Sequence, residues 1–95
     1  MIQVVVKKIV EMLEGYTLFA VNDDGVDLLS LSNYNYDQFL PDEKFTIHVY
    51  RNDVGVGWIE IDPTYEKPLI LDNSHHVIIE EVIEELHLIL NGGQL

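Results

Sequence analysis

Hydrophobic residues recur with helical spacing at both ends of the chain. Near the N-terminus one side of a helical wheel collects Ile2, Val5, Val6, Ile9, Val10, Met12 and Leu13, before a stop signal at Gly15. Within His75 to Leu90 one arc collects Ile78, Ile79, Val82, Ile83, Leu86, Ile89 and Leu90, before Asn91-Gly92-Gly93. Both segments are expected to be helices. For Ile2 to Val6 a strand stays open as the alternative, because three consecutive β-branched valines lose rotamer freedom in a helix.

Between these segments the chain has the composition and alternation of strands. Five short runs are expected to be strands: Tyr16 to Val21, Val26 to Leu31, Phe45 to Arg51, Val56 to Asp62 and Leu69 to Leu71. Turn sequences at 22–25 and 52–55 join the first and second pairs into two hairpins. Ser32 to Leu40 predicts a long loop or a short helical turn, and residues 72–74 are expected to cap the last helix.

The order of these elements predicts an α+β fold. We expect an antiparallel sheet of four to five strands, containing two hairpins, with the N- and C-terminal helices packed on one face. The chain has 95 residues, of which 47% are hydrophobic, enough for one two-layer core. Residues 1–95 therefore predict a single domain.

Charge restricts the possible partners more than any motif does. Seventeen Asp and Glu stand against five Lys and Arg, for a formal net charge of −12. This sign argues against direct binding to nucleic acid or to an anionic membrane, because both need cationic side chains, and favours a basic protein partner. The chain has no cysteine and no run of 18 apolar residues, and Lys7 and Lys8 interrupt the first apolar stretch. We expect a cytoplasmic protein that does not cross a membrane.

Four carboxylates gather on the outer arc of the last predicted helix: Glu80, Glu81, Glu84 and Glu85. The i,i+4 pairs within this group repel, each costing about 0.2–0.5 kcal/mol, and neighbouring carboxylates lie about 5–6 Å apart. That spacing is comparable with successive phosphates along a nucleic-acid strand. Val77 and Leu88 share the same arc, where a face serving only solubility would carry polar residues. We therefore expect an interface here, with a homodimer among the options.

Further acids lie at the first hairpin and before the third strand, and we include five of them in the expected partner-binding surface: Asp23, Asp24, Asp27, Asp42 and Glu43. In composition and size the chain resembles the small acidic proteins, many of them phage-encoded, that mimic DNA and occupy nucleic-acid sites on host proteins. The resemblance implies that carboxylates replace phosphates and, for a phage-encoded chain, that the protein acts in the host cytoplasm. It implies a basic target such as a histone-like nucleoid protein, a restriction enzyme, a glycosylase or RNA polymerase.

Motifs for metal binding are incomplete. Asn22 to Asp27 superficially resembles a calcium loop, but Ala20 and Leu31 would occupy two of its ligand positions. Glu84-Glu85-Leu86-His87 matches half of a di-iron motif, with His76 and Glu80 along the same helix edge, and the complementary helices are missing. We expect a plain turn at the first site and no metal or cofactor at either.

Motifs for catalysis are also incomplete. His48 or His75 offers a general base, but no nucleophile elbow or phosphate-cradling glycine loop accompanies it. Val54-Gly55-Val56-Gly57 follows a predicted hairpin turn and opens a strand, so its glycines are expected to serve a turn, a bulge or close packing near Trp58. The larger aromatic residues are interpreted as core-edge residues or interface anchors: Tyr34, Tyr36, Tyr50, Tyr65 and Trp58.

The leading hypothesis from the sequence is a non-enzymatic DNA mimic that inhibits a basic nucleic-acid-binding protein by occupying its DNA site. The alternative is a structural or adaptor module that forms a homo-oligomer, with the charge serving solubility alone. Salt distinguishes the two, because screening weakens the first kind of complex far more than the second.

Overall fold

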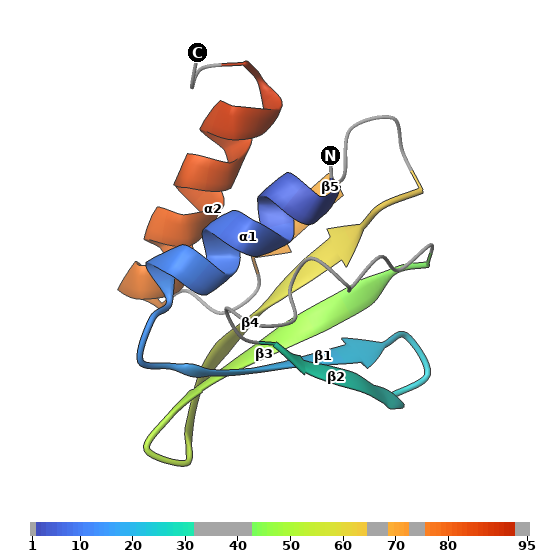
Figure 1. The fold of residues 1–95 in the computed structure, drawn as a ribbon, viewed down its shortest axis with the longest axis vertical. Helices are drawn as coiled ribbons and strands as arrows, with labels where there is room; N and C mark the ends of the chain where they lie inside the picture. The colour runs from blue at the N-terminus through green and yellow to red at the C-terminus, as the bar shows by residue number, and fades with distance from the viewer. Residues whose placement is uncertain (1, 32–42, 65–68, 73–75, 93–95) are drawn as a thin grey trace.

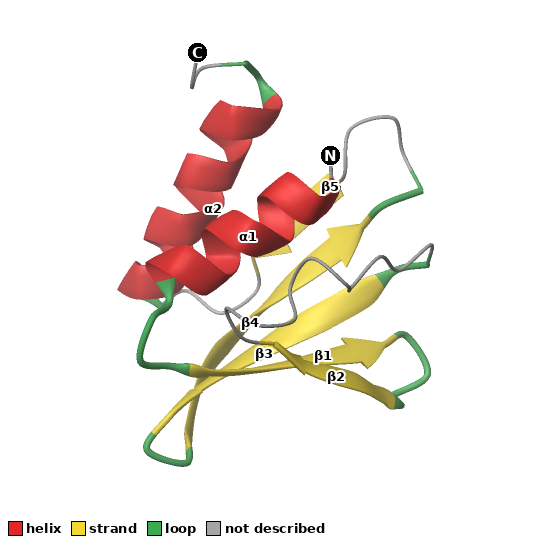
Figure 2. Cartoon of the chain, viewed as in Figure 1, coloured by secondary structure: helices red, strands yellow, loops and turns green. Residues whose placement is uncertain are grey.

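The computed structural model describes residues 2–31, 43–64, 69–72 and 76–92. The helices and strands within these ranges are, in chain order, α1 (Ile2–Met12), β1 (Thr17–Asn22), β2 (Asp27–Leu31), β3 (Phe45–Arg51), β4 (Val54–Asp62), β5 (Leu69–Asp72) and α2 (Val77–Leu90). The strands form one antiparallel sheet in the order β2-β1-β3-β4-β5, and both helices lie against the same face of it (Figure 1; Figure 2). The predicted α+β class is confirmed, with five strands in the described residues.

The N-terminal segment is a helix, so the strand alternative for Ile2 to Val6 is wrong. Helical spacing places Val5, Val6, Ile9 and Val10 together on one buried side, while Val4 remains about half exposed. Burial of four aliphatic side chains contributes more than the rotamer freedom that β-branched residues lose in a helix. The turn after α1 includes Tyr16, whose N–H donates to the Leu13 carbonyl at 3.0 Å, so β1 begins one residue later than predicted.

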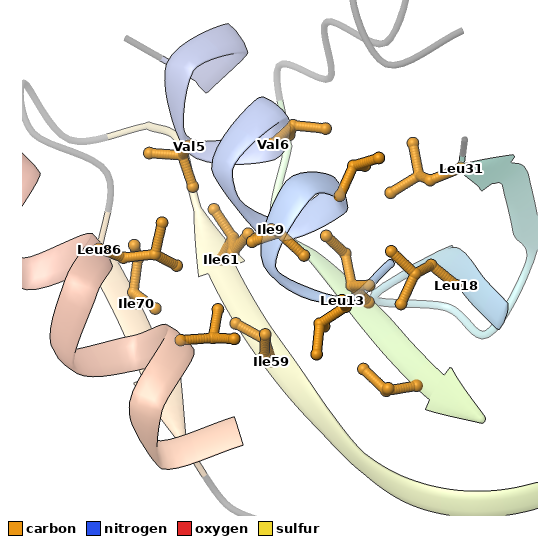
Figure 3. Close-up of a cluster of buried hydrophobic side chains, with 14 of the residues drawn as sticks. Val5, Val6, Ile9, Leu13, Leu18, Leu31, Ile59, Ile61, Ile70 and Leu86 are labelled. Atoms are coloured by element: carbon orange, nitrogen blue, oxygen red, sulfur yellow. The ribbon is translucent and has the colours of Figure 1, made fainter. Parts of the chain in front are cut away.

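The central strand β3 shows why the sheet has one buried face. Its alternation leaves Phe45, Ile47 and Val49 fully buried, whereas His48 and Tyr50 point to the other side and are partly exposed. Figure 3 shows residues of both helices meeting sheet residues in this core, among them Val5, Val6, Ile9, Leu13, Leu18, Leu31, Ile59, Ile61, Ile70 and Leu86. The helices are therefore held to the sheet by one continuous hydrophobic cluster.

The β3–β4 hairpin is tighter than predicted. The expected turn covered 52–55, but the turn consists of Asn52 and Asp53, with φ of 53° and 65°, and β4 begins at Val54. Two successive left-handed residues are the signature of a type I′ turn, whose twist matches that of the flanking strands. Asn and Asp tolerate this conformation better than other side chains, which explains how the strand extends by two residues.

The β1–β2 turn confirms the interpretation of residues 22–25 as plain turn chemistry. The Asn22 side-chain oxygen accepts the N–H groups of Asp24 at 3.0 Å and Val26 at 2.9 Å, and Gly25 has φ 81°. Because Val26 also bonds to the Asn22 backbone, it belongs to the turn, and β2 begins at Asp27 instead of Val26.

At the last helix the cap differs from the expectation. His76 is the N-cap, its Nδ1 accepting the Ile78 N–H at 3.2 Å, and α2 starts at Val77 instead of residue 75. Residue 72 ends β5, whereas 73–75 and the segment 32–40 lie outside the described residues. Neither α1 nor α2 is long and apolar enough to span a bilayer.

Candidate functional site

The outer side of α2 carries the carboxylates predicted from the helical wheel. We call Glu80, Glu81, Glu84 and Glu85 the acidic face of α2. The first three are exposed and Glu85 is partly buried, because it lies closer to the arc that packs on the sheet. Val77 and Leu88, at the two ends of the helix, are 67% and 44% exposed. The structure thus places all six predicted residues of this helix on one element, most of them accessible to a partner.

The acidic face of α2 forms no ion pair with the part of the chain that the structure describes. The helix contains neither Lys nor Arg. The cations whose contacts are seen lie on other elements: Lys7 is 4.0 Å from Glu11 within α1, Lys44 is 3.9 Å from Asp23, and Arg51 lies over the Tyr16 ring. Within the described parts of the chain, no ion pair therefore neutralises the α2 carboxylates.

The remaining predicted acids form a separate group at the opposite edge of the sheet. Asp23 and Asp24 lie in the β1–β2 turn, Asp27 begins β2, and Glu43 is an exposed residue just before β3. Asp42 lies outside the described residues.

The strand order keeps this group away from α2. β2 is at one edge of the sheet, whereas α2 packs against β5 and β4 toward the other (Figure 1). The predicted partner-binding residues therefore fall into two separate groups. The sequence could not predict this division, because strand order is a long-range property that the local sequence pattern does not contain.

The second face of the sheet carries a group of rings that sequence reasoning did not bring together. We call Phe19, His48, Tyr50 and Trp58 the aromatic sheet face. Phe19, His48 and Trp58 lie opposite one another in a single register row across β1, β3 and β4. Phe19 packs edge-on against Tyr50 with ring centroids 5.9 Å apart, and the His48 and Trp58 rings are 6.5 Å apart. No described element covers these rings, and Phe19 and Trp58 are 39% and 38% exposed.

Two shallow depressions flank His48 on this face. The larger, about 330 Å³, lies between Tyr50 and Trp58, and the smaller, about 240 Å³, is lined by Phe19, Val21, His48 and Tyr50. The lining of the larger one includes Gly55, which lies opposite Tyr50 and contributes no side chain to this face. A β-bulge pairs Tyr50 with Gly55 and Val49 with Gly57, and the Tyr50 ring covers Gly55 closely.

Sequence signals identified part of this face. The strand expected at Phe45 to Arg51 contains His48 and Tyr50, which alternation places on the same side. Tyr50 and Trp58 were interpreted as core-edge or interface residues, which fits their partial exposure. Phe19 was missed, because its position beside His48 depends on the pairing of β1 with β3. Tyr34, Tyr36 and Tyr65 lie outside the described residues.

Both surfaces offer groups for non-covalent contact with a partner. Among the described residues, no three His, Cys, Asp or Glu side chains are grouped as a metal site. His76, one of the histidines weighed as a ligand, uses its Nδ1 to cap α2. Carboxylates on α2 and rings on the sheet offer charge and contact area to a partner.

Comparisons of the chain with protein-family models, with curated proteins and with solved structures gave no match.

Proposed function

We propose that this protein is a non-enzymatic inhibitor of a basic nucleic-acid-binding protein, and that the acidic face of α2 occupies the DNA site of that protein. The observation that carries the proposal is a row of accessible carboxylates that form no ion pair with the described residues, bracketed by two exposed aliphatic side chains, Val77 and Leu88. A face that served only solubility would have no need of exposed Val and Leu at its ends.

The dimensions of α2 suit the replacement of a short piece of duplex. Its 14 residues span about 20 Å, the length of roughly six base steps. Glu80 and Glu84 form one row of carboxylates and Glu81 and Glu85 a second, with about 6 Å of axial rise within each row. A cationic groove that binds phosphates would meet carboxylates at intervals similar to the spacing of phosphates along a nucleic-acid strand.

The two kinds of side chain make different contributions to the complex. Uncompensated charge speeds encounter with a cationic surface by about 10–1,000-fold, and this gain falls as salt rises. Burial of the exposed aliphatic groups adds a term that does not depend on salt and slows dissociation. We therefore expect tight binding at low salt and a weaker residual affinity at high salt.

A competition experiment tests the proposal. A histone-like nucleoid protein bound to fluorescent duplex DNA is titrated with the wild type and with a quadruple variant in which Glu80, Glu81, Glu84 and Glu85 are changed to Lys. Fluorescence anisotropy should show that the wild type displaces DNA and that the variant needs at least about tenfold higher concentration, because its helix now repels the cationic groove.

The matched control changes Asp23, Asp24, Glu43 and Asp53 to Lys. Four such reversals add eight charges, so both variants go from −12 to −4. The control should compete within about threefold of the wild type, because α2 is unchanged. Equal losses in both variants would assign the effect to net charge instead of the acidic face of α2. Failure of the wild type to displace DNA from a nucleoid protein, a restriction enzyme, a glycosylase and RNA polymerase would contradict the proposal.

The homo-oligomer alternative makes a different prediction in sedimentation. It requires the wild type to self-associate at micromolar concentration with little dependence on salt, because its contacts would be apolar. A salt-insensitive dimer that does not displace DNA would favour it over the inhibitor.

A further inference from the structure

The aromatic sheet face continues into carboxylates along β4. Trp58, Glu60 and Asp62 alternate with the buried residues Ile59 and Ile61, so all three leave the sheet on its uncovered side. Glu60 pairs with Thr46, two register rows beyond His48 and Trp58 and therefore in the next row on the same face. Rings and carboxylates thus follow one another on the same surface.

The end of this face near Asp62 is negative overall. Lys44 lies 3.9 Å from the Asp23 carboxylate, and its charge also acts on Asp62. The carboxylates of Asp23, Glu60 and Asp62 therefore outnumber the single ammonium group of Lys44 among these described residues. Arg51 does not enter this region, because its guanidinium lies over Tyr16 at 5.3 Å. The face therefore offers π-systems and net negative charge together, and organic cations are attracted to both.

The spacing along β4 matches the repeat of an extended peptide. Trp58 and Glu60 are two residues apart on one strand face, about 6.6 Å. Alternate side chains of an extended ligand peptide have the same separation. A cationic side chain that contacts the Trp58 ring at the edge of the 330 Å³ depression would therefore bring the side chain two residues further along toward Glu60.

We propose that the aromatic sheet face binds an extended basic peptide segment of a partner protein, with arginines at alternate positions. One guanidinium stacks in the depression between Tyr50 and Trp58, and the next pairs with Glu60. Arginine suits both positions, because its flat guanidinium stacks on rings and forms paired hydrogen bonds with carboxylates. The site lies on the opposite side of the sheet from α2 and does not rest on the function proposed for that helix.

Charge also decides against the other occupants of such a face. Exposed rings on a sheet stack well on the bases of single-stranded nucleic acid, but the phosphates would approach a molecule of net charge −12. A second copy of the chain would bring the Glu60 and Asp62 carboxylates of both molecules toward one interface. A cationic peptide meets neither repulsion.

The chain contains a single tryptophan, so its fluorescence reports directly on this site. The probe is a synthetic peptide, Thr-Arg-Thr-Arg-Thr-Arg-Thr, and the matched control peptide carries neutral citrulline in place of each arginine. At about 150 mM salt the arginine peptide should change the Trp58 emission saturably, and the citrulline peptide should bind at least about tenfold more weakly.

Variants locate the bound peptide, with anisotropy of a labelled peptide as the second readout. Glu60→Gln, which preserves side-chain shape, and Tyr50→Leu, which preserves an apolar cover for Gly55, should each weaken binding about threefold to tenfold. The quadruple lysine variant of α2 should bind within about threefold of the wild type. Circular dichroism verifies that each variant is folded.

Three results would overturn the proposal. The first is wild-type affinity in Glu60→Gln and Tyr50→Leu together with loss of binding in the α2 variant, which would place the peptide on the helix. The second is a Trp58 response to single-stranded oligonucleotide that exceeds the response to the arginine peptide. The third is a dimer that covers Trp58 and dissociates in Trp58→Leu.

Discussion

Asp62 illustrates how a single side chain holds the end of β4. The Thr64 hydroxyl and the Thr64 backbone N–H both donate to Asp62 Oδ1, the latter at 3.0 Å. These hydrogen bonds stabilise the ionised carboxylate and lower the pKa of Asp62, partly opposed by desolvation and supported by the charge of Lys44. The chain therefore turns away from β4 around a group that stays negative in mildly acidic solution.

We predict that Thr64→Val raises the pKa of Asp62 toward its usual value, because the hydroxyl donor is removed while the backbone donor remains. Because the folded-state pKa is lowered, the stabilisation is present above about pH 4 and is lost as the pH falls through the folded-state pKa. Titration of the Asp62 carboxyl carbon by NMR measures the change. Thr17→Val, on β1, is the control and should leave the titration unaltered; an unaltered titration in Thr64→Val would refute the assignment.

Helix α2 combines a well-packed side with an electrostatically unfavourable one. Ile79, Val82 and Leu86 are fully buried and hold the helix to the sheet. The pairs of the acidic face repel at i,i+4, and the helix contains no Lys or Arg that would offset this repulsion. Packing therefore stabilises a helix whose charges oppose its own formation, which is consistent with a surface that serves binding.

We predict that the double variant Glu84→Lys, Glu85→Lys is more stable than the wild type by about 1 kcal/mol, because two repulsive i,i+4 pairs become attractive. For a domain of this size the melting temperature should rise by about 4–8 °C. Calorimetry measures the change. The control Asp24→Lys, Glu43→Lys has the same net charge, changes two exposed residues and should gain less. DNA competition by the α2 variant should fall while its stability rises. A melting temperature below that of the wild type would contradict this account.

The sequence predicted elements better than their arrangement. Period-3.6 patterns located both helices, and strict alternation gave the limits of β3 from Phe45 to Arg51. The β3–β4 turn was predicted two residues too long, because left-handed backbone at Asn52 and Asp53 lets β4 begin at Val54. Local sequence patterns indicate which residues tolerate a given backbone conformation. They do not specify which of those residues adopt positive φ in the folded chain.

The same division applies to the candidate surfaces. The acidic face of α2 follows from one helical wheel and was predicted in full. The row of Phe19, His48 and Trp58 depends on strand pairing between residues far apart in the sequence, and no local pattern specifies it. The separation of Asp23, Asp24, Asp27 and Glu43 from α2 likewise depends on strand order.

At the scale of the whole molecule, a net charge of −12 is carried by a small protein whose radius of gyration is 12.2 Å. Most of the described Asp and Glu side chains are exposed, so their charges repel one another across the solvent, where added salt screens them. Unfolding separates these charges, which means that repulsion lowers the free energy of unfolding at low ionic strength.

We predict that the melting temperature rises by several degrees between about 10 mM and 300 mM NaCl, because screening relieves this repulsion at a Debye length that shortens from about 30 Å to below 10 Å. Thermal denaturation followed by circular dichroism measures the effect. The quadruple lysine variant of α2, at −4, should respond less steeply. Equal slopes for the two proteins would show that salt acts through something other than net charge.

The helices and the exposed rings lie on opposite sides of one sheet, and this arrangement fixes what can be bound at the same time. A molecule seated on α2 leaves the rings accessible, because a full layer of β-structure and core separates them. Two ligands therefore do not exclude each other sterically, and saturation of both sides would give a ternary assembly with this protein as the middle layer.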